Sequence, residues 1–275
     1  MTTDAVPTTG GTLPALAVAA HGGPCVAVTT LAALLAVAAD LDLTTGVVVT
    51  AAVLTGQLTI GWGNDLLDAR RDASVGRTDK PLADGRLDPA LVRGCLTAAA
   101  VACVALSVAV GWRSALVHLV LLVGMGHAYN LGLKATALSW LPYAVAFGSL
   151  PAVVTLAGPD GAWPAWWLMA AGASLGVGAH LLNTLPDLAD DARTGVRGLP
   201  HRIGEQASRV VAAVVLAGAS ALAVLGPGDP HPVTWAALGL VAVLALVAAT
   251  GRGRTPFRAA VVIALVDVVL LVAAG

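Results

Sequence analysis

Apolar residues dominate the chain in nine stretches, each long enough to cross a bilayer as a helix. A membrane-spanning helix needs roughly 20 mainly apolar residues. Gly22, Gly23 and Pro24 interrupt the first stretch, so we expect a kink there. The pattern predicts an all-α integral membrane protein with nine transmembrane helices. The stretches cover residues 13–39, 45–64, 89–111, 114–130, 136–157, 164–184, 207–226, 232–250 and 256–274.

Composition supports a membrane protein. The chain has 275 residues, of which 57% are hydrophobic and 11% charged, and its mean hydropathy is +0.85. Soluble domains carry roughly 25% charged residues. The net charge of −1 excludes a strongly basic nucleic-acid-binding protein. We expect residues 1–12 to form a disordered tail and residues 13–275 a single domain, because the loops leave no room for a soluble one.

The basic residues predict the orientation in the membrane. The loops after the second, fourth, sixth and eighth stretches hold 14 of the 15 Lys and Arg residues, and Arg113 alone lies on the other side. The positive-inside rule then places these loops and the N-terminus in the cytoplasm. Arg outnumbers Lys 13 to 2, a bias associated with GC-rich bacteria. We therefore expect a multi-pass protein of a bacterial cell membrane.

Acidic and amide residues gather at the end of the second stretch. If the helix continues, Asp65, Asp68 and Asp72 follow at i, i+3 and i+7 and share one face. Charges beside a bilayer are costly and point to function. Carboxylate oxygens suit Mg²⁺, and Asn64 adds an amide oxygen. Basic residues in the following loop can grip phosphate oxygens; they are Arg77 and Lys80.

A second polar cluster begins at the end of the sixth stretch. Asn183, Asp187 and Asp191 follow one another at intervals of one helical turn, and a basic, glycine-containing loop comes next. Two facing clusters of this kind are able to hold a diphosphate between metal ions. The roles of Asp190, beside the second cluster, and Asp267, within the last stretch, stay open.

These motifs resemble those of the UbiA superfamily of membrane-embedded prenyltransferases. The similar elements are N-D-x-x-D-x-x-x-D at 64–72, R-x-x-K-P-L-x-x-G at 77–85, D-x-x-x-D at 187–191 and R-T-G-V-R-G-L-P-x-R-I-G at 193–204. The resemblance implies nine helices around a central cavity near the cytoplasmic face. It also implies Mg²⁺ as cofactor, with Asp65, Asp68, Asp187 and Asp191 catalytic. The implied metal ligands are Asn64, Asp65, Asp68, Asp72, Asp187 and Asp191, and the implied diphosphate-binding residues are Arg77, Lys80, Tyr129, Lys134 and Arg197.

Three polar residues within the stretches are candidates for the cavity or the acceptor site. They are His21, His180 and Asn183, and the last two lie on the same helix face as Asp187. Near its first helix the superfamily often has Arg-Pro or Lys-Pro, whereas this chain has His21-Gly-Gly-Pro24. This departure puts the usual acceptor contacts in doubt.

The resemblance implies a Mg²⁺-dependent enzyme that transfers a prenyl group from an isoprenyl diphosphate to a lipophilic acceptor, such as an aromatic or quinone precursor, and releases pyrophosphate. Alternatives within the fold are a terpene cyclase and a phosphoribosyl transferase. An ion-coupled transporter is a rival of another class, although acids at helix ends fit it poorly. Prenyl length and acceptor stay open, and no sequence feature indicates an obligatory protein partner.

Overall fold

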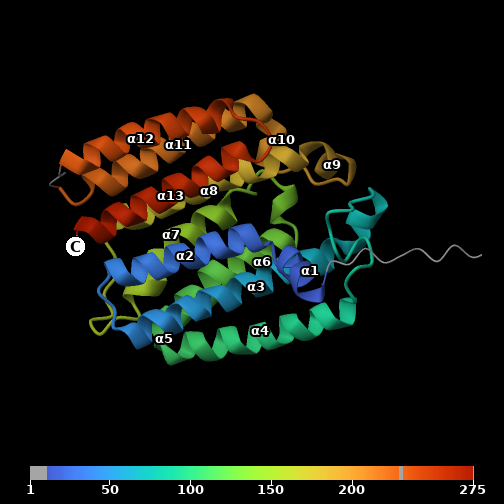
Figure 1. Cartoon of the computed structure of the whole chain (residues 1–275), viewed down its shortest axis with the longest axis horizontal. Coiled ribbons are helices and arrows are strands. Elements are labelled where there is room, and N and C mark those ends of the chain that lie inside the picture. Colours follow the sequence, from blue (N-terminus) through green and yellow to red (C-terminus); the bar gives the residue numbers. More distant parts are fainter. Residues whose placement is uncertain (1–10, 229–231, 275) are drawn as a thin grey trace, which may run out of the picture.

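The computed structural model describes residues 11–228 and 232–274, and every regular element in these ranges is helical. Figure 1 shows long helices lying side by side along one axis. The elements are α1 (Thr12–Ala19), α2 (Gly22–Ala38), α3 (Leu43–Ser74), α4 (Pro89–Ala109), α5 (Trp112–Leu116), the π-helical η1 (Val117–Val123), α6 (Gly124–Asn130), η2 (Leu133–Ala135), α7 (Leu141–Thr155), α8 (Trp166–Thr184), η3 (Leu185–Asp187), α9 (Leu188–Arg193), α10 (Leu199–Ile203), α11 (Glu205–Leu225), α12 (Pro232–Thr250) and α13 (Thr255–Ala274).

Helical content agrees with the predicted stretches, but fewer than nine of the described helices have the length and composition of a membrane span. By length and composition five helices can cross a bilayer: α3, α4, α8 with its continuation through α9, α11 and α13. Counting the bent pair of α1 and α2 as one span gives six. The described part of α12 and the whole of α7 are apolar but shorter. The chain is therefore a multi-pass membrane protein, whereas the predicted number of nine membrane-spanning helices is not confirmed.

Two boundaries differ from the predicted stretches for local reasons. Helix α3 continues to Ser74 instead of ending near residue 64, so it carries the first acidic cluster. Helix α7 begins at Leu141 rather than near residue 136, because hydrogen bonds of Ser139 hold the preceding turn in place. The Ser139 hydroxyl hydrogen-bonds His180 Nε2 at 2.9 Å and accepts the Leu199 amide at 2.8 Å. Of the predicted disordered tail, residues 1–10 lie outside the described residues, and α1 already begins at Thr12.

The predicted kink in the first stretch is confirmed as a corner between α1 and α2. The two helices meet at 71°. His21 sits in the break in the left-handed conformation, with φ 54°, and such backbone strain is often stored at functional sites. The corner packs directly on α3 at Gly61, where any Cβ would collide with the Ala20 carbonyl oxygen. Gly61 thus lets the corner approach one turn before Asp65.

Helices α7 and α8 also approach closely through glycines. Added Cβ atoms on Gly172 and Gly176 would overlap the carbonyl oxygens of Phe147 and Tyr143. The contact lies inside the apolar core, which joins α2, α7, α8, α11 and α13. It fixes one wall of the central cavity described below.

Candidate active site

The polar clusters lie at one end of the bundle. In Figure 1 the short helices α1, α9 and α10 and the loop after α3 gather at that end. Asp65, Asp68 and Asp72 share one face of α3 and are 1%, 7% and 4% exposed. Buried carboxylates need charged or hydrogen-bonding partners, and neighbouring segments provide them.

The deepest carboxylate, Asp65, is held by two groups from distant segments. Its Oδ1 lies 2.6 Å from Lys80 Nζ and 3.1 Å from His21 Nε2. Lys80 Nζ is in turn 3.0 Å from His21 Nε2. The other oxygen, Asp65 Oδ2, is buried without a hydrogen-bond partner in the described part of the chain. The α1–α2 corner and the loop after α3 therefore converge on one carboxylate, which keeps one buried oxygen without a hydrogen-bond partner.

Asp68 is surrounded by donors. Lys134 Nζ contacts both of its oxygens, at 2.8 and 2.6 Å. Arg71 and the Asn64 amide approach Oδ2 at 3.0 and 3.2 Å. The Asn64 amide also donates to Asn130 Oδ1 at 3.0 Å. Helix α6 and the η2 turn are thereby tied to the acidic face of α3.

The second cluster meets the first through arginines. Arg77 reaches Asp187 at 3.1 Å, and Arg71 lies 3.4 Å from Asp72 and 3.9 Å from Asp191. The two acidic groups, about 120 residues apart in sequence, are thus linked by cations from α3 and its following loop. Positive charges stand between the carboxylates and offset their mutual repulsion.

Asp79 fixes the position of Arg77. Its two oxygens accept hydrogen bonds from Arg77 Nε and Nη2, both at 2.8 Å. The hydrogen-bonded guanidinium lowers the pKa of Asp79 to about 2, and the same contact raises the pKa of Arg77. Because a depressed carboxyl pKa keeps the pair charged above it, Arg77 stays oriented throughout the neutral range.

These residues line one charged pocket. Among the predicted site residues its lining includes His21, Asn64, Asp68, Asp72, Arg77, Lys80, Tyr129, Lys134, Asn183, Asp187 and Asp191. Asp65 lies just behind the wall, bonded to two of them.

Other predicted residues lie away from this pocket. Arg197 is exposed and borders a separate hollow with His201. His180 is 1% exposed, bonded to Ser139 and packed edge-on against Tyr129 at 5.8 Å, so it supports the wall without lining it. Asp190 pairs with Arg193 at 2.7 Å. Asp267 of α13 is buried and accepts a hydrogen bond from Ser220 of α11 at 2.9 Å.

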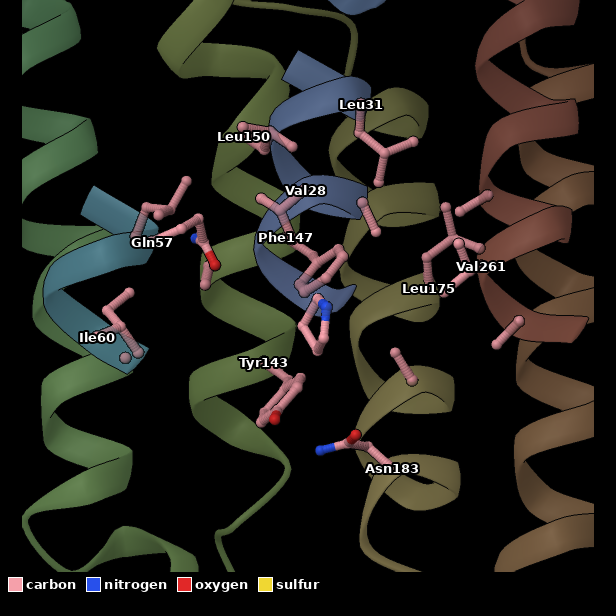
Figure 2. Close-up of a pocket in the computed structure, with 18 of the residues that line it drawn as sticks. Val28, Leu31, Gln57, Ile60, Tyr143, Phe147, Leu150, Leu175, Asn183 and Val261 are labelled. Carbon is pink, nitrogen blue, oxygen red and sulfur yellow. The ribbon is translucent and has the colours of Figure 1, made fainter. Parts of the chain in front are cut away.

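Figure 2 shows an apolar cavity inside the bundle. The cavity adjoins the charged pocket. The two share Pro24, Tyr143 and Asn183 as a junction. The Tyr143 and Asn183 side chains are hydrogen-bonded to each other. Deeper in the cavity, Phe147 stacks on Tyr143 with ring centroids 6.3 Å apart. A charged head group and an apolar tail of one ligand therefore both find matching surroundings.

The donor set fits Mg²⁺. Carboxylate and amide oxygens are its preferred ligands, and Mg²⁺ usually takes one or two carboxylates, waters and substrate phosphates. Among the described residues, no three His, Cys, Asp or Glu side chains are grouped closely enough to hold a metal by themselves. The unpartnered Oδ2 of Asp65 supplies an available ligand atom.

Three of the pocket residues that sequence reasoning missed have clear structural roles. Arg71 was counted only as a cytoplasmic charge, although its place between Asp68 and Asp72 on one helix was a usable signal. Asn130 donates to the Ile60 carbonyl at 3.0 Å and orients Asn64. Tyr143 forms the junction, but a single tyrosine near a helix start carries no distinctive pattern.

Comparisons with known proteins identify the family of the chain. A family model described as the UbiA prenyltransferase family matches residues 25–268. The chain belongs to that family. No curated protein matches it by sequence.

Several solved structures are similar to this UbiA family member in fold. A UbiA homolog from Aeropyrum pernix K1, in its apo form, has a TM-score of 0.74 at 18% identity, covering 89% of this chain and 95% of its own. A UbiA homolog from Archaeoglobus fulgidus, bound to GPP and Mg²⁺, has a TM-score of 0.68 at 13% identity, with coverage of 94% and 98%. A digeranylgeranylglyceryl phosphate synthase has a TM-score of 0.67 at 16% identity, with coverage of 96% and 98%. At these identities the likeness shows the fold.

Proposed function

We propose that this UbiA family member transfers a prenyl group from an isoprenyl diphosphate to a lipophilic acceptor, with Mg²⁺ as cofactor. The observation that carries the proposal is the continuity of a charged pocket with an apolar cavity through Pro24, Tyr143 and Asn183. The similarity to a homolog bound to GPP and Mg²⁺ supports it. We further propose one nine-span domain in a bacterial cell membrane, with the N-terminus and the charged loops cytoplasmic.

In this proposal the acidic residues hold Mg²⁺ and the basic residues hold the diphosphate. The metal-holding set is Asn64, Asp65, Asp68, Asp72, Asp187 and Asp191, and the diphosphate-holding set is Arg77, Lys80, Lys134 and Tyr129. Arg197 is left out because it is exposed and does not line the pocket. When diphosphate enters, the ammonium groups of Lys80 and Lys134 leave the aspartate oxygens and bind phosphate oxygens instead. An ammonium group forms strong charge-assisted hydrogen bonds with either kind of oxygen.

The reaction breaks the bond between C1 of the prenyl group and the diphosphate oxygen, and the electron pair leaves with pyrophosphate. A new bond forms between C1 and the nucleophilic atom of the acceptor, whose proton passes to water at the pocket mouth. Bound Mg²⁺ would neutralise the negative charge that grows on the leaving group. The side chains of Lys80, Lys134 and Arg77 would add positive charge at the same place, and the apolar lining would keep water from the cation.

A single assay tests the proposal. Membranes containing the protein are incubated with C10 to C20 allylic diphosphates and Mg²⁺, with and without quinone precursors. We expect Mg²⁺-dependent pyrophosphate release and a prenylated product in the lipid extract by mass spectrometry. A cyclised hydrocarbon made without acceptor would indicate a terpene cyclase, and no pyrophosphate with any diphosphate would refute the proposal.

A further inference from the structure

Gln57 is a polar exception in the wall of the apolar cavity. It projects from α3, and Figure 2 shows its amide directed inward, toward the space between Val28 and Phe147. The amide has no hydrogen-bond partner in the part of the chain that the structure describes. By contrast, the junction residues Tyr143 and Asn183 bond to each other.

A hydrocarbon tail has no hydrogen-bond donor or acceptor for the Gln57 amide. Covering a primary amide with apolar groups and no compensating hydrogen bond destabilises the bound state. The prenyl chain of the proposed substrate has no donor or acceptor, so an apolar residue at position 57 would suit it better. The amide therefore indicates a second bound molecule that carries a polar atom.

The position of Gln57 places that polar atom inside the cavity. Gln57, Gly61, Asn64 and Asp68 follow at i, i+4, i+7 and i+11, so one face of α3 runs from the cavity to the charged pocket. At 1.5 Å per residue, Gln57 lies about 10 Å deeper along the helix than Asn64. An acceptor bonded to Gln57 would extend back toward the junction, where C1 of the prenyl group would lie.

The cavity also restricts the charge of that molecule. Among the described residues that line it, none is Asp, Glu, Lys, Arg or His. The cations nearest to its mouth are engaged with aspartates, Lys80 with Asp65, Lys134 with Asp68 and Arg77 with Asp187. In the proposed reaction these cations hold the diphosphate, so they are not available to an acceptor carboxylate. A carboxylate in this cavity would be buried without a positive partner, which is strongly unfavourable.

We propose that Gln57 binds the oxygen of an uncharged, hydroxyl- or carbonyl-bearing lipophilic acceptor, and that the enzyme discriminates against acceptors carrying a carboxylate. This inference rests on the proposed prenyl transfer and narrows its acceptor class. The amide can both donate to a carbonyl and accept from a hydroxyl, so it suits a phenol, quinol or alcohol.

The test uses the full chain in membranes with a matched pair of acceptor probes, 1,4-naphthalenediol and 1,4-dihydroxy-2-naphthoate. The donor is the allylic diphosphate that gives the fastest pyrophosphate release. The variants are Gln57→Met, which keeps length but removes hydrogen bonding, and Thr55→Val as a control. The Thr55 hydroxyl bonds to the backbone oxygens of Ala51 and Ala52 in its own helix and to the Cys103 side chain, and Thr55 lines neither pocket.

We expect the wild type to prenylate the uncharged diol with kcat/KM at least tenfold above that for the carboxylate. Gln57→Met should raise the KM for the diol about five- to tenfold, the effect of a hydrogen bond contributing about 1–1.4 kcal/mol, and Thr55→Val should not. Equal or better use of the carboxylate, no transfer to the diol, or an unchanged KM in Gln57→Met would overturn the inference. Absence of pyrophosphate release from every diphosphate would instead refute prenyl transfer itself.

Discussion

Replacing Lys80 by Met is expected to damage both stability and substrate binding, and the two effects can be separated. Lys80 Nζ lies 2.6 Å from Asp65 Oδ1, and the side chains are 15% and 1% exposed. Removing one partner of a buried ion pair costs about 3–5 kcal/mol, because the other charge stays buried and unpaired. Since Lys80 keeps some exposure and His21 also contacts Asp65, we expect about 3 kcal/mol, near the lower limit.

Loss of diphosphate binding should follow from the same substitution. A hydrogen bond to a charged group contributes about 1.5–3 kcal/mol, so the KM for the diphosphate should rise about 10- to 150-fold. The double variant Lys80→Met/Asp65→Asn also removes the Asp65 charge, which the single variant leaves buried without Lys80. It should therefore recover most of the lost thermal stability without recovering activity.

Thermal unfolding in detergent and steady-state kinetics measure these two effects on the same preparations. The single variant should melt well below the wild type, and the double variant should melt close to it. A single variant as stable as the wild type would contradict the ion pair. An unchanged KM for the diphosphate would remove Lys80 from the binding site.

Two further predictions concern the corner and the topology. Gly61→Ala should lower both thermal stability and activity, because the new Cβ would collide with the Ala20 carbonyl oxygen and displace the α1–α2 corner; activity and melting equal to the wild type would refute this role. Single cysteines at Thr78 and Arg193, which are exposed, should be labelled from the cytoplasmic side, and one at Asp160 from the opposite side. Labelling of the first two from opposite sides would contradict the proposed topology.

Helical periodicity made the acidic face of α3 predictable. Spacings of three and four residues place Asp65, Asp68 and Asp72 together whatever the tertiary fold, provided the helix continues to Ser74, as it does. The kink was equally readable, because the Gly-Gly-Pro run weakens a helix locally. The meeting of the two clusters was an inference from their resemblance to each other, and the structure brings them to one pocket.

Other features depend on packing between distant segments and leave no local pattern. Arg71 gains its role only because α9 brings Asp191 within 3.9 Å. His180 was expected to line the cavity, but contact with Ser139 and the tyrosine rings covers it. In the sequence, Gln57 is one polar residue in an apolar stretch. Only the structure shows that it lines the apolar cavity.

The central claim is that the two acidic clusters form one Mg²⁺-dependent diphosphate site, and pyrophosphate release tests it most directly. The wild type, Asp68→Asn and Asp187→Asn are compared with and without Mg²⁺, using the same allylic diphosphate and confirming equal folding by thermal melting. The account predicts release from the wild type only with Mg²⁺ and a loss of at least about a hundredfold in each variant, as for removing one electrostatic contact to the transition state. Release that does not require Mg²⁺, or that persists when either aspartate is replaced, would contradict it.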